Sequence, residues 1–462
     1  MNKEHLLKEV GVSELIKSLI STDVLPDSKM NKRGEKFMKV ENLKDIDLNR
    51  LTRKSYGDDE SLERRVAEIL KRVREDGEEA IYQLTEEFDK VDLRQNGLRV
   101  SDEEFQRAYQ EVKEEFVLAL RTAKGNILRY HEKQKRTSWL DPDSDGSILG
   151  QLLLPLNRVG IYVPGGTASY PSSVLMNALP AVVAGVKEIV MVSPPRLDGT
   201  LLPEVLVAAA EAGVTEVYKV GGAQGIAALA YGTEHISPVD KITGPGNIYV
   251  TLAKKQVFGI VDIDMLAGPS EILILADESG RPEELAADLL SQAEHDRLAS
   301  AILVSPSRGL LEQTISEVER QLVDLPRVEI ARASWETYGA AICVSDLGEG
   351  MALANKIAPE HFELVVKEPY TWLGQVRNVG AVFLGRYSPE PVGDYFAGPN
   401  HVLPTGGTAR FYSPLNVDTF MKKVSVIGYS EVALKRDAKQ IALLARSEGL
   451  EAHARAVEVR FK

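Results

Sequence analysis

The region from residue 150 to residue 384 alternates short apolar runs with longer stretches of helical apolar spacing. The apolar runs end at glycine or proline, as buried strands that turn into helices do. This alternation is typical of βαβ units, whose parallel strands form a sheet covered by helices. The predicted strands are 158–163, 188–192, 216–220, 271–275, 301–304, 340–344 and 381–384. We therefore expect an α/β fold built on parallel sheet.

Two of the predicted strands end in the same tripeptide, Val-Ser-Pro, which begins at Val192 and again at Val304. The two copies are 112 residues apart, close to the size of one small doubly wound domain. The repeat is consistent with two Rossmann-like domains, but unrelated α/β strands also end in such turns, and the two interpretations weigh equally. The length of 462 residues leaves room for about three domains of roughly 150 residues.

The flanking segments differ from this region in composition. Residues 1–37 pair a helical apolar pattern with a polar linker, and residues 60–136 are dense in Glu, Lys and Arg, which predicts two or three solvated helices. From residue 430 the pattern is helical again. The expected organisation is an N-terminal extension (1–37), a helical part of the first large domain (38–160), two Rossmann-like domains (161–270 and 271–415) and a C-terminal helical tail (416–462).

Composition excludes several classes of protein. The 55 Lys and Arg against 68 Asp and Glu leave a net charge of −13, which works against a broad nucleic-acid footprint or an anionic membrane surface. The single cysteine, Cys343, rules out an intrachain disulfide and a multi-cysteine metal site. Glu4, Glu9 and Glu14 interrupt any signal-like or transit-like N-terminal run, so we expect a cytoplasmic protein.

Glycine-rich turns follow three predicted strands, at residues 164–167, 221–225 and 244–247. Ligands of open α/β sheets bind beyond the carboxyl ends of the strands, and a helix that starts after such a turn offers free N–H groups to a phosphate. None of the turns is a G-x-G-x-x-G or Walker A loop, so each one alone is more often a tight βα turn. Tyr162, just before the first turn, fits either a base-stacking or a core role.

Gln292 and His295 stand at i and i+3 at the end of a helical pattern that starts at Pro282. They share one helix face and offer an oxygen and a nitrogen to a metal ion. The alternative, a histidine favoured by the helix C-terminal dipole, is preferred for the pair alone.

Glu360 and His361 are adjacent in an expected loop, and these residue types can divide acid and base roles. A surface pair is the preferred interpretation on spacing alone. The loop 393–401 carries Asp394 and His401 among glycines and prolines, and function and an ordinary connection are equally favoured there.

His453 lies on the expected final helix, where an exposed side chain is the simpler interpretation. Taken together, however, Gln292, His295, Asp394 and His453 supply two nitrogens and two oxygens, a set that suits Zn²⁺, Mn²⁺ or Co²⁺. The other histidines are expected to be structural or surface residues: His5, His131 and His235.

Several long motifs occur in a fixed order from about residue 38 to the C-terminus. They are Gly160-Ile-Tyr-Val-Pro-Gly-Gly166, Gly221-Gly-Ala-Gln-Gly225, Val239-Asp-Lys-Ile-Thr-Gly-Pro-Gly-Asn247, Ala267-Gly-Pro-Ser-Glu271, Leu290-Ser-Gln-Ala-Glu-His295, Pro359-Glu-His361 and Gly398-Pro-Asn-His-Val-Leu-Pro404. On these motifs the chain resembles the histidinol dehydrogenase family. Residues 1–37 are a departure, since typical members lack them, and they are either an added helix or an upstream-extended start.

The resemblance implies an NAD-dependent oxidation of L-histidinol to L-histidine through L-histidinal, in two successive hydride transfers. It implies an aldehyde-dehydrogenase-like architecture and a homodimer whose tail crosses to the partner. The implied ligands of one zinc per subunit are Gln292, His295, Asp394 and His453. The implied bases are Glu360 and His361. The implied substrate contacts are Ser270, Gln292, His295, His361, Asp394, His401, Glu448 and His453. The implied NAD contacts are Tyr162, Gln224 and Asn247.

The implied dinucleotide contacts place NAD on the 161–270 side, and the zinc and catalytic residues on the 271–415 side. Two other classes of protein compete with the dehydrogenase. Two histidines and a carboxylate also suit a metal-dependent hydrolase that activates water. A non-catalytic α/β ligand-binding protein is the third class, and the expected absence of a signal peptide counts against it.

Overall fold

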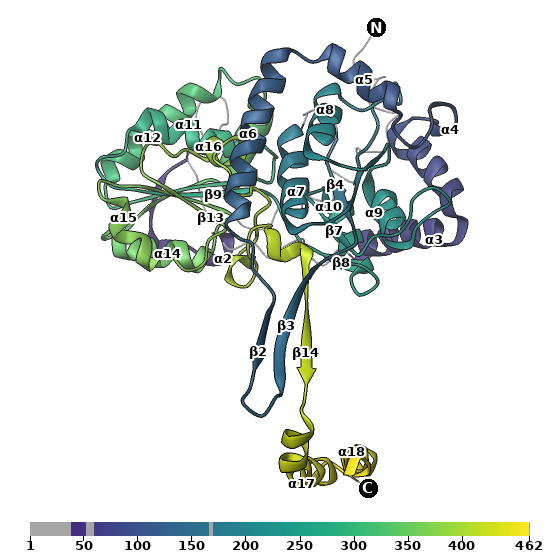
Figure 1. The fold of residues 1–462 in the computed structure, drawn as a ribbon. Coiled ribbons are helices and arrows are strands. Elements are labelled where there is room, and N and C mark those ends of the chain that lie inside the picture. The colour runs from purple at the N-terminus through teal and green to yellow at the C-terminus, as the bar shows by residue number, and fades with distance from the viewer. Residues whose placement is uncertain (1–37, 52–59, 166–169, 462) are drawn as a thin grey trace.

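The computed structural model describes residues 38–51, 60–165 and 170–461. Two parallel sheets with helices on both faces form the body of the molecule, and an antiparallel arm projects from it (Figure 1). The α/β class expected from the sequence is therefore confirmed. The helix expected within residues 1–37 lies outside the described residues.

The first sheet has five parallel strands in the order β6-β5-β4-β7-β8. Its strands are β4 (Arg158–Tyr162), β5 (Glu188–Val192), β6 (Glu216–Tyr218), β7 (Lys241–Thr243) and β8 (Asp262–Ile263). The connecting helices are α7 (Pro171–Ala184), α8 (Pro203–Ala212), α9 (Gly222–Tyr231) and α10 (Ile248–Val257).

The second sheet has six parallel strands in the order β1-β11-β10-β9-β12-β13. Its strands are β1 (Val40–Asn42), β9 (Glu271–Ala276), β10 (Ser300–Ser305), β11 (Ala340–Cys343), β12 (His361–Val365) and β13 (Ala381–Leu384). The helices around it are α2 (Leu48–Leu51), α11 (Pro282–Ala293), α12 (Arg308–Leu322), α13 (Val328–Tyr338), α14 (Leu347–Ile357), α15 (Pro369–Trp372) and α16 (Glu390–Tyr395).

The two sheets are wound in the same order. The order β6-β5-β4-β7-β8 of the first sheet corresponds, strand by strand, to the order β11-β10-β9-β12-β13 of the second. The second sheet has one additional strand, β1, at the edge beside β11. This agreement supports the duplication that the repeated Val-Ser-Pro turns left open. In both sheets the winding reverses direction between the first and fourth strands, at β4–β7 and at β9–β12. Such switch points are where open α/β sheets bind ligands.

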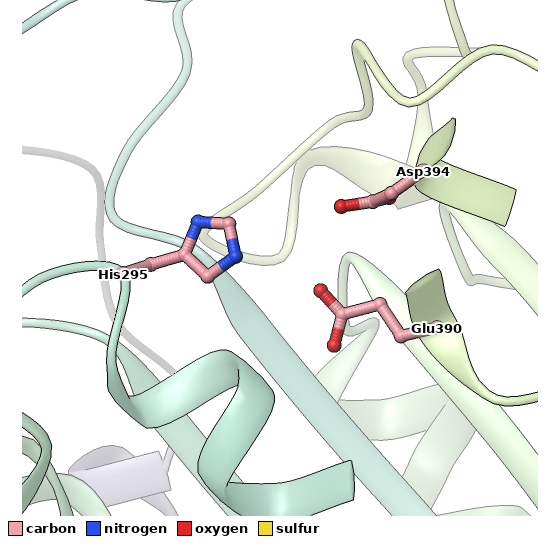
Figure 2. A group of neighbouring side chains, drawn as sticks. All are labelled: His295, Glu390 and Asp394. Atoms are coloured by element: carbon pink, nitrogen blue, oxygen red, sulfur yellow. The ribbon is translucent and has the colours of Figure 1, made fainter. Parts of the chain in front are cut away.

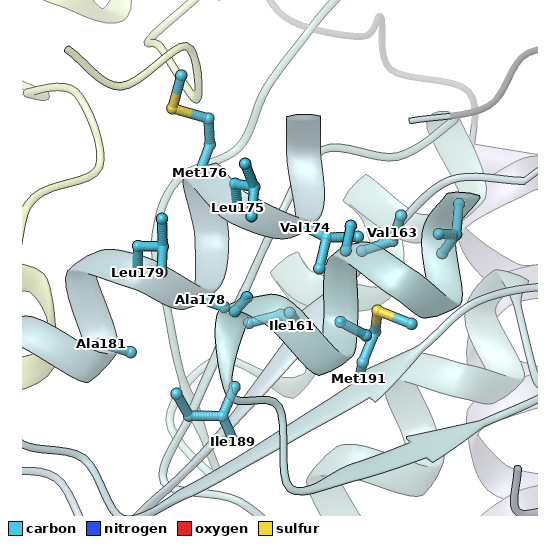
Figure 3. Close-up of a cluster of buried hydrophobic side chains, with 14 of the residues drawn as sticks. Ile161, Val163, Val174, Leu175, Met176, Ala178, Leu179, Ala181, Ile189 and Met191 are labelled. Carbon is cyan, nitrogen blue, oxygen red and sulfur yellow. The ribbon is translucent and has the colours of Figure 1, made fainter. Parts of the chain in front are cut away.

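Apolar side chains on both faces of each strand explain the layered core. Along β9, Ile272 and Ile274 belong to one apolar cluster and Leu273 and Leu275 to the other, because alternate side chains of a strand point to opposite faces. All six residues of β9 are buried, as expected of a strand covered by helices on both sides. The same packing joins α7 to the first sheet (Figure 3), through Ile161, Val163, Val174, Leu175, Met176, Ala178, Leu179, Ala181, Ile189 and Met191.

The charged segment 60–136 forms helices, as predicted. They are α3 (Glu60–Asp89), α4 (Leu93–Asn96), α5 (Asp102–Glu111) and α6 (Glu114–Glu132). The helix α3 is kinked at Gly77, whose positive φ of 58° suits glycine. Its apolar face packs beside α9, where Val73 and Ile81 share a buried cluster with Ala227. The strand β1, in contrast, pairs with β11 of the second sheet, although the sequence places residues 38–160 with the first domain.

The arm is a three-stranded antiparallel sheet in the order β14-β3-β2, followed by two helices. Its elements are β2 (Trp139–Pro142), β3 (Ile148–Pro155), β14 (Met421–Gly428), α17 (Glu431–Ser447) and α18 (Glu451–Glu458). The helices lie at the far end of the arm, away from both parallel sheets (Figure 1). The C-terminal helices were predicted, whereas the antiparallel sheet was not. Among the described residues, none of the helices is long and apolar enough to cross a membrane.

Candidate active site

A group of buried polar side chains lies at the amino ends of β9 and β12, the switch-point strands of the six-stranded sheet. His361 is the first residue of β12 and pairs in register with Ile272 of β9. The preceding helix α14 stops at Ile357, because Ala358 takes a positive φ of 58° and Pro359 cannot continue a helix. Because the helix ends here, Glu360 and His361 follow at once and are buried in the core.

The imidazole of His361 is surrounded by oxygen atoms. Its Nδ1 lies 3.1 Å from the Glu271 carbonyl oxygen and its Nε2 lies 3.5 Å from Asp394 Oδ1. Nδ1 also lies 3.7 Å from Glu360 Oε2 and 3.9 Å from Glu390 Oε1. Burial alone lowers the pKa of His361, but the negative charges of Glu390, Glu360 and Asp394 outweigh it and hold this pKa well above its usual value.

The carboxyl group of Glu360 is almost as enclosed. Its Oε2 accepts a hydrogen bond from the Glu271 backbone N–H at 3.0 Å. Burial raises the pKa of Glu360 to about 8, although the His361 charge pulls it down. The preferred interpretation of a surface pair is wrong, because both side chains are buried; Glu360 does lie in the bend before β12, whereas His361 is the first residue of that strand. A group with a pKa near neutrality is suited to general acid–base chemistry.

Three side chains beside His361 could hold a metal ion. His295 follows the end of α11, and Glu390 and Asp394 lie one turn apart on α16 (Figure 2). One ligand atom from each of the three lies within 4.8 Å of the others. Nitrogen and carboxylate oxygen together suit Zn²⁺ and similar ions.

The charges of this group respond to one another. Burial raises the pKa of Glu390 to about 7, with Asp394 adding to the rise and His361 opposing it. Burial also favours a raised pKa at Asp394, but His361, His401 and His295 outweigh it and lower that pKa. Two carboxylates this close to each other disfavour ionisation of both, and together with the imidazole they attract a cation.

Sequence reasoning missed Glu390. Its spacing of four residues from Asp394 was the available signal, because i and i+4 side chains share one helix face. The backbone N–H of Glu390 donates to Glu363 Oε1 at 2.8 Å, which anchors the first turn of α16 on β12.

Gln292 is fully buried against the same group. With its amide oriented so that its polar atoms are satisfied, Nε2 donates to Glu390 Oε1 at 3.2 Å and lies 3.1 Å from His361 Nδ1.

His401 connects this site to the first sheet. Its Nδ1 lies 2.9 Å from the Asp394 carbonyl oxygen, and its Nε2 lies 3.3 Å from Ser173 Oγ on α7. Ser270 immediately precedes β9. The structure therefore brings together most of the predicted residues at the six-stranded sheet: Ser270, Gln292, His295, Glu360, His361, Asp394 and His401.

The other two predicted residues of this site do not join it within the chain. Glu448 follows α17 and His453 lies on α18, both at the end of the arm (Figure 1). Among the histidines expected to be structural, His131 Nδ1 lies 2.8 Å from Gln134 Oε1 and His235 Nδ1 lies 2.7 Å from Glu78 Oε2. His5 lies outside the described residues.

The predicted dinucleotide contacts line one cavity of about 580 Å³ at the carboxyl ends of the five-stranded sheet. Tyr162 ends β4, and its hydroxyl accepts a hydrogen bond from Gly222 N at 3.2 Å. Gln224 lies in the first turn of α9, and Asn247 caps α10 by accepting from Tyr249 N at 3.0 Å. A Cβ at position 244 would collide with the carbonyl of Tyr162, so the turn before Asn247 requires glycine. The structure thus brings Tyr162, Gln224 and Asn247 together.

Two sheets of one winding order, with a buried polar centre at one and an open cavity at the other, define an α/β protein with a candidate active site. The sequence model of the histidinol dehydrogenase family matches residues 52–461. The chain is 60% identical over 401 residues to the histidinol dehydrogenase of Moorella thermoacetica, covering 87% of this chain and 95% of that protein. It is 53% identical over 423 residues to that of Bacillus subtilis, covering 92% and 99%.

A solved structure, histidinol dehydrogenase from Elizabethkingia anophelis, superimposes with a TM-score of 0.85 at 37% identity, covering 91% of this chain and 96% of that one. The chain belongs to the histidinol dehydrogenase family. It is therefore an oxidoreductase of histidine biosynthesis that acts on histidinol, and the hydrolase and receptor alternatives are set aside.

Proposed function

We propose that the protein oxidises L-histidinol to L-histidine through L-histidinal, with NAD⁺ as the acceptor of two successive hydrides. The observation that carries the proposal is the buried Glu360–His361 pair beside a group of metal-binding side chains. An alcohol and an aldehyde oxidation at one centre need a base for each step, and this pair supplies two. We assign the nucleotide to the 161–270 side and the chemistry to the 271–415 side.

The residues present fit a metal ion, because His295 and Asp394, both partly buried, converge with the buried Glu390 on one point. We propose Zn²⁺, one per subunit, bound by Gln292, His295, Asp394 and His453 of the partner subunit. Bound there, Zn²⁺ would act as a template that orients the substrate, and NAD⁺ would accept the hydride. Glu390 would then orient the Gln292 amide through their hydrogen bond, as carboxylates bonded to a metal ligand do.

His361 is proposed to take the alcohol proton as the hydride leaves. A cation bound beside Glu390 and Asp394 would counter two of the charges that raise the pKa of His361, which would favour its neutral form. The contact between Nδ1 and the Glu271 carbonyl favours the tautomer whose Nε2 lone pair is available. Glu360 activates the water that adds to the aldehyde before the second hydride transfer. Ser270 and His401 complete the substrate contacts.

Tyr162, Gln224 and Asn247 are proposed to bind NAD⁺. The cavity that they line lies at the switch point of the five-stranded sheet, next to the first turns of α9 and α10. Helix N-termini present free N–H groups to phosphate oxygens, which suits the pyrophosphate of a dinucleotide. We also propose a cytoplasmic location, where both NAD⁺ and the substrate of a biosynthetic pathway are found.

The arm is proposed to cross to a second copy of the chain, forming a homodimer. Its large apolar side chains are unusually exposed: Trp139 52%, Leu149 51%, Ile427 75%, Leu443 69% and Leu444 66%. Exposed apolar side chains gathered in this way mark association surfaces. The crossing would bring Glu448 and His453 to the partner's active site.

Two experiments test the proposal. Purified protein with Zn²⁺, NAD⁺ and L-histidinol should form NADH, and the absence of NADH would refute it. For the shared site, a His453→Ala chain mixed with a His295→Ala chain should recover part of the activity that each has lost. Verified heterodimers with no recovery would show that the arm does not complete the neighbouring site.

A further inference from the structure

The cavity that holds Tyr162, Gln224 and Asn247 contains one acidic side chain that the proposed function does not use. Asp89, the last residue of α3, lines this cavity and also a second one of about 450 Å³, which continues past residues 193–198. The two cavities share Pro164, Gly165 and the prolines that follow β5. Asp89 therefore stands where the two meet.

The ionised carboxylate of Asp89 lowers the stability of the protein when no ligand is bound. Its Oδ2 is closed to solvent and has no hydrogen-bond partner among the described residues. Burial raises the pKa of Asp89 to about 6, so the group is still mostly ionised at neutral pH. Its place at the C-terminal end of a helix adds a second unfavourable effect, because the helix dipole is negative there.

Among the described residues, no cation forms an ion pair with Asp89 that would offset this cost. The ammonium of Lys90, the next residue, donates instead to the Glu87 carbonyl at 2.7 Å. Arg65 is the other charged residue of the first cavity, and no ion pair joins it to Asp89. A charged group kept without a partner in a cavity wall points to a ligand that supplies one.

We propose that Asp89 selects the cofactor, accepting hydrogen bonds from the hydroxyls of the adenosine ribose and excluding a dinucleotide with a 2′-phosphate. This inference rests on the proposed function, because it requires NAD⁺ in the cavity. An ionised carboxylate only accepts hydrogen bonds, and a ribose diol is a matching pair of donors. A phosphate at the same place puts two anions in contact within a partly buried site.

The position of Asp89 decides which ribose it contacts. Hydride transfer takes place at the amino ends of β9 and β12, so the nicotinamide half of the cofactor points toward the six-stranded sheet. Helix α3 lies on the opposite side of the five-stranded sheet from β9 and α11 (Figure 1). Asp89 therefore meets the adenosine half, whose 2′-hydroxyl is the one that distinguishes NAD⁺ from NADP⁺.

The test compares Asp89→Asn with Glu87→Gln, an exposed carboxyl on the same helix that loses the same charge. For Asp89→Asn we expect KM for NAD⁺ to rise about 10-fold, because a hydrogen bond to a charged group is lost. The value of kcat should stay within about 2-fold of wild type. The preference for NAD⁺ over NADP⁺ in kcat/KM should fall by about 10-fold or more. The melting temperature of the free protein should rise, because a costly buried charge is removed. Glu87→Gln should change none of these.

The outcomes separate the two proposals. A wild-type protein that forms NADH, with an Asp89→Asn variant of unchanged cofactor preference, overturns the role of Asp89 and leaves the function standing. A lower melting temperature with equal losses for both dinucleotides also overturns it, because that is the signature of a structural aspartate. A wild-type protein that neither binds NAD⁺ in calorimetry nor forms NADH overturns both.

Discussion

The two parallel sheets share one winding order but use opposite ends of their switch-point strands. In the five-stranded sheet, the cavity lies beyond the carboxyl ends of β4 and β7. In the six-stranded sheet, the polar centre lies at the amino ends of β9 and β12. The same topology thus supports two sites of different chemistry.

Helix direction explains the difference. The carboxyl ends of strands lead into helices, so α9 and α10 present their N-termini to the cavity, where a phosphate is favoured. The amino ends of strands follow helices, so α11 ends just before His295 and α14 ends just before Glu360. The C-terminal ends of helices favour a cation. One end of the fold suits an anionic cofactor, and the other suits a metal ion.

The charged side chains also differ between the two sites. The residues that line the first cavity include only two charged side chains, Arg65 and Asp89. The second site gathers Glu360, Glu390 and Asp394 around His361. If this comparison is correct, damage at one end should leave binding at the other end intact.

The largest effect is expected from His361→Asn. Removal of the proposed general base should lower kcat for histidinol by about 10³-fold while the affinity for NAD⁺ is unchanged. Glu360→Gln is the matched variant, and it should chiefly impair oxidation of L-histidinal. Stopped-flow measurement of NADH with each substrate checks the pair. Equal losses of both variants with both substrates would refute the division of roles.

The next largest effect is expected on the affinity for Zn²⁺. Asp394→Asn removes a proposed ligand and should weaken Zn²⁺ binding more than Glu390→Gln, which removes a residue that orients Gln292 and should cost about 10- to 100-fold. Competition with a chromogenic chelator measures both affinities. A larger loss for Glu390→Gln would make Glu390 a ligand. A loss of NAD⁺ affinity in either variant would break the separation between the two ends.

A smaller effect is expected at the cofactor end. Gln224→Ala should raise KM for NAD⁺ by about 10-fold, because one hydrogen-bonding group is lost, and should leave the zinc content at one per subunit. Asn247→Asp is a useful companion, since aspartate keeps the cap of α10 but adds a negative charge near the phosphates. Steady-state kinetics and metal analysis of the same preparations are required. Unchanged KM in both variants would remove these residues from the cofactor site.

The smallest effect concerns stability of the metal-free protein. The folded chain raises the pKa of Glu360 from 4.5 to about 8, so it holds this proton more tightly than the unfolded chain does. The contribution of Glu360 to stability therefore falls as pH rises through that window. Melting temperatures at pH 5.5 and pH 8 in chelator should differ by a few degrees more in wild type than in Glu360→Gln. Parallel pH profiles would show that Glu360 is not buried as an acid.

Much of the fold follows from the sequence because buried parallel strands have a strong local pattern. Seven predicted strands are present, and α11, α17 and the helix of His453 are where the apolar spacing puts them. The strand β12 was missed, since its polar residues His361 and Glu363 mask the apolar run. The arm was missed too, because the stability of β3 comes from pairing with the distant β14.

The site residues were found in a different way. Spacing alone made Gln292–His295 a weak candidate for metal binding and Glu360–His361 a weak candidate for acid–base catalysis. Only the family resemblance, based on the ordered motifs, assigned them to one site with Asp394. Neither route found Glu390 or Asp89. Both are acidic residues in helices, and the roles proposed for them depend on groups that are far away in the sequence.

The central claim is that a metal-dependent centre and an NAD⁺ site act together in one four-electron oxidation. The most direct measurement is the amount of NADH formed per L-histidinol at limiting substrate, with and without a chelator. We predict two NADH per histidinol with zinc, and none after chelation although NAD⁺ still binds. One NADH per histidinol, or undiminished turnover without metal, would contradict the account.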